Sequence, residues 1–186
     1  MRVIAGQAKG HRLAGPPSRA TRPTSDLVRG AIFSALDSMG ADLARVLDLY
    51  AGSGALGIEA LSRGAQRCDF VERDAGACAS IRQNLSKTGF EGQGEVLCLP
   101  VERALPRLEG PYTLVLADPP YLPAGRHGAQ EATATLEGLE ERGLVESGRS
   151  TLVLEHSSRE AAPERLAGLT QVKTLRHGDS AVSLYR

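Results

Sequence analysis

The sequence predicts an α/β protein whose sheet is mostly parallel and ends in an antiparallel hairpin. Five short apolar runs predict the parallel strands: residues 46–50, 68–72, 94–99, 112–117 and 150–155. Helical segments lie between the first three runs, and strands that alternate with helices form right-handed crossovers in a sheet buried on both faces. Two further strand-like runs, 170–176 and 180–186, are joined by the short segment HGD, which is typical of a hairpin.

The first part of the chain forms an extension before the parallel sheet. Residues 1–24 contain two brief extended pieces around a glycine-bearing turn, then a proline-rich link, and predict a small β-hairpin. Residues 25–40 predict an amphipathic helix, with Thr24 or Ser25 as its N-cap and Gly40 as its stop. Its apolar positions recur at helical spacing: Leu27, Val28, Ala31, Ile32, Ala35, Leu36 and Met39.

Two more helices are expected between the first three strands. The segment ALGIEALSRGA follows the first strand and ends at Gly64, and DAGACASIRQNLSKTG follows the second strand and ends at Gly89. Both segments therefore lie where a crossover between parallel strands needs a helix.

The composition fits one ordinary domain. The chain has 186 residues, of which 41% are hydrophobic and 24% charged, so it can bury a core without a disulfide or a metal. We expect a single domain over residues 1–186, with the extension at 1–40 and the core at 41–186.

Aromatic residues make up 4% and Trp is absent, which argues against a platform that stacks several bases. No apolar run approaches the roughly 20 residues of a membrane span, so we expect a cytoplasmic protein, and no feature demands a dimer.

The cysteines and histidines predict no metal site. Cys68, Cys78 and Cys98 form no CxxC pair. The histidines are scattered along the chain: His11, His127, His156 and His177. We expect the cysteines to be small buried hydrophobic residues in a reducing compartment.

A glycine-rich loop follows the first predicted strand. In DLYAGSGALG, the residues Gly52, Gly54 and Gly57 satisfy GxGxxG. Small residues let the backbone approach a ligand at the carboxyl end of a strand, where the next helix supplies free N–H groups. The motif does not distinguish NAD, FAD and S-adenosylmethionine (SAM), and a purely structural turn is an alternative.

Two carboxylates narrow the ligand class. Asp48 lies near the end of the first strand, where it would repel a pyrophosphate but suit a ligand with an ammonium group, such as the methionine part of SAM. Glu72 closes the second strand, 20 residues after Gly52, and can accept both ribose hydroxyls of a nucleoside. A solvated charge at a helix start is the alternative for Glu72.

The fourth strand ends in the tetrapeptide Asp118, Pro119, Pro120 and Tyr121. Two prolines make a rigid loop with two fewer N–H donors, which leaves carbonyl oxygens as acceptors. The Asp118 carboxylate and the Pro119 carbonyl could accept both hydrogens of an exocyclic base amine and direct its lone pair at the methyl group of SAM. Tyr121 would stack on a base extruded from its helix. A tight turn with a buried Tyr is the alternative.

The net charge of zero conceals an uneven distribution. In residues 1–30, six cations and the single carboxylate of Asp26 leave a charge of +5, so the other 156 residues sum to −5. The cations are Arg2, Lys9, Arg12, Arg19, Arg22 and Arg29. We expect Arg2, Lys9, Arg12 and Arg19 to contact an RNA backbone, with a merely solvated arm as the alternative. The loop 122–130 is a further candidate clamp on a base or on RNA.

These segments together resemble the RsmD family of bacterial 16S ribosomal RNA guanine-N2 methyltransferases. In chain order they are RVIAGQAKGHRL, RPTSDLVRGAIFSAL, VLDLYAGSGALGIEALSRGA, FVERD, LADPPY and GDSAVSLYR. The resemblance implies a class I SAM-dependent methyltransferase fold, which is Rossmann-like. DPPY alone is shared by many amino-group methyltransferases, and the RPTSD segment together with the glycine loop narrows the family.

The resemblance also implies roles for individual residues. The methionine end of SAM would be held by Asp48, Ala51, Gly52, Ser53 and Gly54, and its ribose by Glu72. The tetrapeptide 118–121 would form the target-base pocket. Arg22 and Thr24 would lie near the cofactor carboxylate, although Arg22 could instead contact RNA phosphate.

The sequence departs from the family pattern at three positions. Leu27 and Gly30 stand where Arg and Glu are usual, which puts in doubt any ion pair or RNA contact there. Pro100 replaces a polar residue after the third strand, so adenine recognition would rest on backbone near Leu99 and Val101.

The resemblance and the motifs predict a monomeric enzyme that transfers a methyl group from SAM to the N2 amine of a guanine in 16S rRNA or in a small-subunit assembly intermediate. Adenine-N6 methylation of RNA or DNA uses the same tetrapeptide geometry and is the enzymatic alternative. A non-catalytic RNA-binding protein with the same fold is the other alternative. A dehydrogenase leaves the C-terminal hairpin and DPPY without a role.

Overall fold

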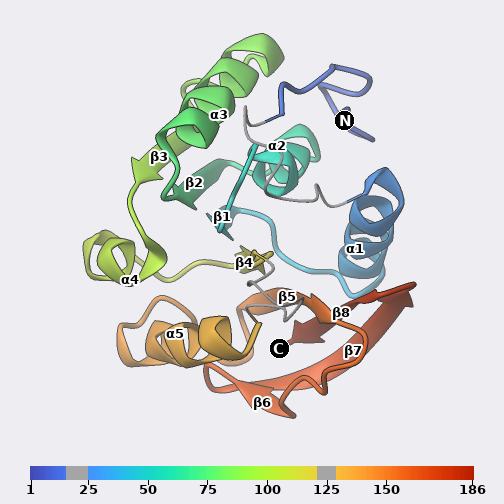
Figure 1. Ribbon diagram of the computed structural model, residues 1–186, viewed down its shortest axis with the longest axis vertical. Helices are drawn as coiled ribbons and strands as arrows, with labels where there is room; N and C mark the ends of the chain where they lie inside the picture. Colours follow the sequence, from blue (N-terminus) through green and yellow to red (C-terminus); the bar gives the residue numbers. More distant parts are fainter. Residues whose placement is uncertain (16–24, 121–128) are drawn as a thin grey trace.

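The computed structural model describes residues 1–15, 25–120 and 129–186. Within these residues one eight-stranded sheet has the order β3-β2-β1-β4-β5-β8-β7-β6 (Figure 1). Its first five strands run parallel, and β8, β7 and β6 are added antiparallel. The strands are β1 Arg45–Leu49, β2 Arg67–Glu72, β3 Gly94–Cys98, β4 Leu114–Ala117, β5 Thr151–Ser157, β6 Arg165–Leu166, β7 Leu169–His177 and β8 Ser180–Tyr185. The predicted sheet, including its C-terminal hairpin, is therefore confirmed.

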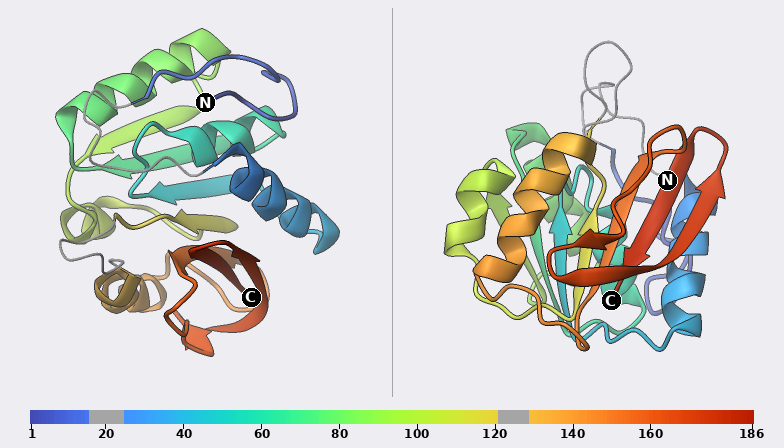
Figure 2. Two further views of the ribbon diagram at one scale, coloured as in Figure 1. Left: turned by 45° about the vertical axis from the view of Figure 1, so that its right-hand side comes forward. Right: turned by 90° about the horizontal axis from the view of Figure 1, so that it is seen from below.

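Helices cover both faces of the parallel strands (Figures 1 and 2). One hydrophobic cluster joins α1, α2 and α3 to one face, and a second joins α4, α5 and a short 3₁₀ segment to the other. The bounds are α1 Asp26–Ser38, α2 Ala55–Ser62, α3 Ala75–Thr88, α4 Val101–Ala104, the 3₁₀ segment Leu105–Arg107 and α5 Ala129–Glu141. This arrangement explains why the parallel strands are continuous apolar runs, since both faces are buried.

The helix ends follow the capping residues of the sequence. The Ser25 hydroxyl accepts a hydrogen bond from the Val28 N–H at 3.2 Å, so Ser25 is the N-cap of α1. Asp74 caps α3 in the same way, through the Ala77 N–H at 2.8 Å. Gly89 ends α3 in the left-handed conformation, as predicted.

The predicted N-terminal hairpin is present, but its two sides are joined by an isolated bridge and not by paired strands. Its two sides form an isolated antiparallel bridge between Arg2 and Arg12, and the Val3 N–H donates to the His11 carbonyl at 3.0 Å. No regular strand forms within residues 1–15, which we call the N-terminal arm. Beyond this bridge, the backbone of the arm bonds to side chains of α2 and, at Ala14, to Asn84 of α3.

The partners on α2 are the side chains of Glu59 and Ser62. The Glu59 carboxylate is fully buried and accepts from the N–H groups of Ile4 and Ala5 at 2.8 and 3.0 Å. The Ser62 hydroxyl accepts from the Ala8 N–H at 3.0 Å. Buried charges persist where hydrogen bonds and counter-ions satisfy them, and Arg63 pairs with Glu59 at 2.9 Å. The N-terminal arm is therefore a docked part of the fold.

Some expectations need correction. Cys68 and Cys78 are buried, but Cys98 is exposed at the end of β3, so the expectation of three buried cysteines is wrong for Cys98. The residues of β3 lie at the edge of the sheet, where one side has no neighbouring strand. The loop 122–130 lies outside the described residues up to 128, and Ala129 begins α5.

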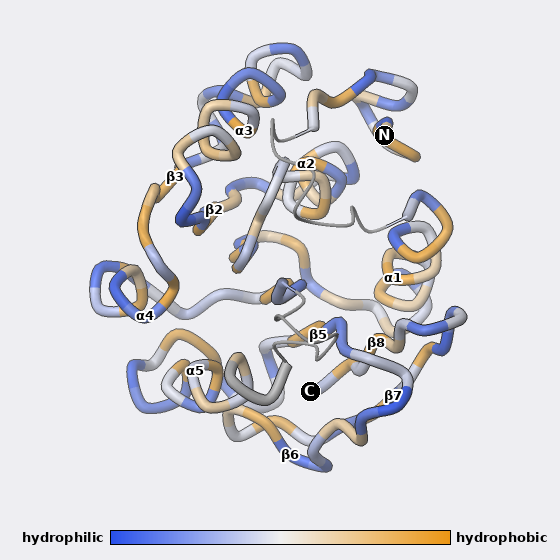
Figure 3. Tube along the Cα trace, in the orientation of Figure 1, coloured by the Kyte–Doolittle hydropathy of each residue, from blue (hydrophilic) through white to orange (hydrophobic). Residues whose placement is uncertain are grey.

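Helix α5 and strand β6 were not predicted. Helix α5 buries Ala132, Leu136 and Leu139 along one side, at a spacing that the sequence shows but that the prediction did not use. Strand β7 is largely exposed and hydrophilic along much of its length (Figure 3). In the part of the chain that is described, no helix has the length and apolar character needed to cross a membrane.

Candidate active site

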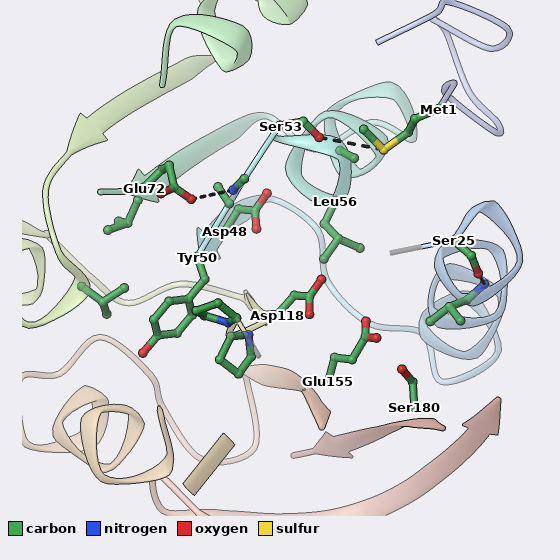
Figure 4. Close-up of a pocket in the computed structure, with 18 of the residues that line it drawn as sticks. Met1, Ser25, Asp48, Tyr50, Ser53, Leu56, Glu72, Asp118, Glu155 and Ser180 are labelled. Carbon is green, nitrogen blue, oxygen red and sulfur yellow. Dashed lines mark hydrogen bonds between the residues drawn. The ribbon is translucent and has the colours of Figure 1, made fainter. Parts of the chain in front are cut away.

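A cavity of about 850 Å³ opens at the carboxyl ends of the parallel strands (Figure 4). Its walls come from the loops after β1, β2 and β4, from the start of α1, from the end of β5 and from the β7–β8 turn. Ligands of open α/β sheets bind at this end of the strands, beside the point where the strand order reverses. Here the reversal lies between β1 and β4.

The glycine loop between β1 and α2 bends sharply into this cavity. Tyr50 has a φ of 58° and Gly52 a φ of 55°, in the left-handed region that residues with side chains seldom adopt. Ala51, Gly52 and Ser53, which the resemblance assigns to the methionine end of SAM, line the cavity. Gly54 faces the core instead, because a Cβ there would lie 3.1 Å from the Ile81 side chain. Gly54 therefore packs against the core and supports the loop on the side away from the cavity.

Gly57 lets α2 pack closely on β2. A Cβ at this position would lie 2.3 Å from the Phe70 ring and 2.6 Å from the Cys68 sulfur. The absence of a side chain also brings the Gly57 N–H within 2.8 Å of the Asp48 carboxylate. The third glycine of the motif thus holds the helix against the strand and fixes a carboxylate of the site.

Asp48 is a buried carboxylate with a raised pKa. Asp48 is 1% exposed, and this burial is the main cause of its raised pKa. The hydrogen bond from Gly57 lowers the pKa, while the nearby Asp118 and Glu72 raise it further. A carboxylate in this setting is stabilised by an incoming cation. The site therefore suits a positively charged ligand group, as the sequence predicts.

Glu72 ends β2 and faces the same cavity (Figure 4). One carboxylate oxygen accepts from the Gly52 N–H at 2.8 Å, and the other from the Asp74 N–H at 2.8 Å. These bonds lock the side chain while leaving each oxygen a second acceptor position. Both oxygens of Glu72 are thus held in place at the cavity wall, and the bond to Asp74 also sets this charge at the start of α3.

On the next wall of the cavity lie Pro100 and Val101, at the start of α4. Pro100 is the N-cap residue of α4 and makes no side-chain cap hydrogen bond. This wall therefore presents apolar side chains, and Pro100 offers no polar side-chain group to the cavity.

The first three residues of the tetrapeptide contribute to the cavity. Asp118, Pro119 and Pro120 line it at the carboxyl end of β4, and the Asp118 carboxylate points into it (Figure 4). Tyr121 lies outside the described residues, as do Arg19, Arg22 and Thr24. The site therefore joins the glycine loop and the tetrapeptide around one space.

Sequence reasoning missed a second carboxylate beside Asp118. Glu155, near the end of β5, lines the cavity and points toward the same space as Asp118 (Figure 4). Four carboxylates thus stand on adjacent strands: Glu72 on β2, Asp48 on β1, Asp118 after β4 and Glu155 on β5. Glu155 followed no motif, and only the strand alternation in the run STLVLE could have suggested it.

Two other segments also reach the cavity without a sequence signal. Arg176 and His177 end β7, Ser180 begins β8, and Ser25 and Leu27 come from the start of α1. Leu27 is 72% exposed, which is unusual for a large hydrophobic residue. The departure from the family pattern at Leu27 therefore lies at the mouth of the cavity.

The cations of residues 1–30 differ in exposure. The side chain of Arg2 is 71% exposed, and Lys9 and Arg12 are exposed as well. Arg29 is fully buried, pairs with Asp26 at 3.0 Å and lies 3.7 Å from Glu59. Arg29 lies in α1 and its charge is paired within the fold, so the exposed cations of the arm are Arg2, Lys9 and Arg12.

The strand order, the glycine loop and the position of the cavity define a class I methyltransferase fold. A solved Escherichia coli structure, "Putative methyltransferase yhhF", is 30% identical with a TM-score of 0.83, and the match covers 100% of this chain and 96% of that one. The chain belongs to the RsmD family, whose model, described as "Conserved hypothetical protein 95", matches residues 1–186.

Two relatives illustrate the breadth of the family. The Bacillus subtilis protein named "Putative rRNA methyltransferase YlbH" is 35% identical over 189 residues, with 100% of this chain and 98% of that protein covered. The Escherichia coli protein named "Ribosomal RNA small subunit methyltransferase D" is 38% identical over 145 residues, with 78% of this chain and 69% of that protein covered.

Proposed function

We propose that the protein is an rRNA methyltransferase that uses SAM to methylate the N2 amine of a guanine in the small-subunit rRNA. The observation that carries this proposal is the meeting of Asp118 and Pro119 with the glycine loop around one cavity. The names of the two relatives support rRNA as the substrate.

The residues of the cavity fit SAM by their chemistry. Asp48 offers a buried negative charge to the methionine ammonium, and Glu72 offers two oriented oxygens to the ribose hydroxyls. Pro100 and Val101 offer apolar contact to the adenine. When bound, SAM supplies an electrophilic methyl group on a sulfonium. A pyrophosphate cofactor fits less well, because the buried carboxylate of Asp48 would repel it.

The tetrapeptide orients the target amine. The amine nitrogen of a nucleobase is a poor nucleophile, because its lone pair is drawn into the ring. The Asp118 carboxylate and the Pro119 carbonyl accept its two hydrogens and favour a pyramidal nitrogen with a directed lone pair. Orientation and fixed charge of this kind lower a barrier without a strong base. The Asp118 carboxylate can also receive the proton that the nitrogen loses.

The basic residues of the N-terminal segment would contact the RNA backbone. Arg2, Lys9 and Arg12 are exposed on the N-terminal arm, and Arg19 belongs to the same basic segment. Because Met1 lines the cavity and α2 anchors the arm, deletion of residues 1–12 would disturb the cofactor site as well. Charge-reversing substitutions of Lys9 and Arg12 give a cleaner test of RNA binding.

The experiment that tests this function uses SAM with a labelled methyl group. Small subunits, and assembly intermediates, that lack RsmD-type methylation are incubated with the protein, and large subunits serve as the control. We expect label in the small-subunit rRNA alone. Label in ribosomal protein, or the absence of label from every particle, would contradict the proposal.

A further inference from the structure

The geometry points to Glu155 as the residue that selects guanine, by accepting a hydrogen bond from the N1–H beside the target amine. The inference rests on the proposed function and assigns a role in it to a carboxylate that no motif includes. Its support comes from strand register, burial and the different hydrogen-bond groups of guanine and adenine.

The sheet register places Glu155 beside Asp118. Ala117 pairs with Leu154 across β4 and β5, so Asp118 and Glu155 are the next pair in the same parallel register. Neighbouring strands lie roughly 4.8 Å apart, and paired residues of parallel strands point to the same face. Figure 4 shows both carboxylates pointing into the same space. A planar base amine and its adjacent ring nitrogen can face such a pair together.

The order of the strands separates Glu155 from the cofactor side of the cavity. Asp48 and Glu72 lie on β1 and β2, with the glycine loop, whereas Glu155 lies on β5 beyond Asp118. Three strand spacings, roughly 14 Å in all, lie between Glu72 and Glu155. The outer pair, Asp118 and Glu155, therefore faces the substrate base.

Burial makes the Glu155 carboxylate selective. The residue is 7% exposed, and water screens a buried carboxylate poorly. Guanine has an N–H donor at N1, next to its N2 amine, so a carboxylate there gains a charge-assisted hydrogen bond. Adenine has a lone pair at N1, next to its N6 amine, and the same carboxylate would repel it. Sites built around such a bond strongly reject bases that lack the donor.

The test replaces the target guanine by 2-aminopurine, which keeps the amine at C2 but carries a lone pair at N1. The methylated nucleotide is first mapped, and small subunits are then reconstituted with guanine or 2-aminopurine at that position. We expect wild-type protein to prefer guanine by roughly 100-fold or more in kcat/KM. In Glu155→Gln the amide can donate to the lone pair, so the preference should fall at least tenfold.

Glu146→Gln is the matched control, because Glu146 is exposed and its partner is Arg149 at 3.6 Å. This variant should keep the full preference. SAM affinity of Glu155→Gln should match wild type and its melting temperature should not fall, whereas the loss of a structural carboxylate would lower it. An unchanged preference in Glu155→Gln would overturn the inference. Equal rates of wild-type protein on guanine and 2-aminopurine would also overturn the inference. This comparison uses wild-type protein alone, so it does not depend on whether the variant folds.

The outcome for Glu155 is separable from that for the proposed function. If the mapped product is N6-methyladenosine, the proposed function fails. If the product is N2-methylguanosine but Glu155→Gln discriminates as wild type does, only the role of Glu155 fails.

Discussion

The substitution Asp48→Asn should make the protein without ligand more stable and weaken its binding of SAM. Asp48 is buried, and its neighbours Asp118 and Glu72 raise its pKa in addition to the effect of burial. The asparagine oxygen can still accept the Gly57 N–H that now bonds to Asp48 at 2.8 Å. The buried charge of Asp48 lowers the stability of the free protein, and it attracts the positive group of the ligand. Its removal should therefore raise stability and weaken SAM binding.

The sign of the pH dependence follows from the raised pKa of Asp48. Between the ordinary value of 3.8 and the raised value, the folded state binds more protons than the unfolded state. The contribution of Asp48 to the free energy of unfolding thus falls as the pH rises through this window. The gain from Asp48→Asn should be largest above the folded pKa and should vanish below pH 3.8.

The magnitudes can be bounded. Each unit of raised pKa corresponds to about 1.4 kcal/mol, and the new amide hydrogens offset part of that gain. A net gain of about 1 kcal/mol would raise the melting temperature by about 2–4 °C for a chain of this size. Loss of a hydrogen bond to a charged partner costs about 1.5–3 kcal/mol, or roughly 10- to 150-fold in the Kd for SAM.

Thermal melting over a pH series and calorimetric titration with SAM measure the two effects. Asp37→Asn is the control, because Asp37 is exposed on α1 and pairs with Arg63 at 3.2 Å. It should leave SAM binding unchanged. A less stable Asp48→Asn protein that binds SAM as tightly as wild type would refute this reasoning and make Asp48 a structural residue.

Three further substitutions test the other parts of the site and fold. Gly57→Ala should destabilise the protein by about 1–3 kcal/mol in urea unfolding, because its Cβ would lie 2.3 Å from Phe70; a neutral effect would contradict the close packing. Glu59→Ala should cost about 3–5 kcal/mol in the same assay, since it leaves the buried Arg29 short of a counter-ion. Asp118→Asn should lower the rate of methyl transfer by about 100-fold or more with little change in SAM affinity measured by titration; lost SAM binding would place Asp118 in the cofactor site.

The fold was largely predictable because its signals are local. Parallel strands buried on both faces are continuous apolar runs, and Ser25, Gly40 and Gly89 mark helix ends by their own conformational preferences. Helix α5 was missed although its buried residues Ala132, Leu136 and Leu139 recur at helical spacing. The fully buried Glu59, in contrast, could not be foreseen, since its burial depends on an N-terminal arm distant in sequence.

The site was predictable where residues follow a strand in a motif. Asp48, Glu72 and Asp118 each end or follow a strand whose place in the sheet the sequence indicates. Glu155 and Arg176 reach the cavity through the pairing of β5, β8 and β7, which depends on contacts between distant parts of the chain. No local pattern contains that information, so only the folded structure brings these side chains to the site.

The chemical identity of the methylated nucleoside tests the central claim most directly. Small-subunit rRNA methylated by the protein with labelled SAM is digested to nucleosides, which are separated and compared with standards. We expect all of the label in N2-methylguanosine. Label in N6-methyladenosine would contradict the guanine-N2 assignment and favour the alternative that the same tetrapeptide geometry allows.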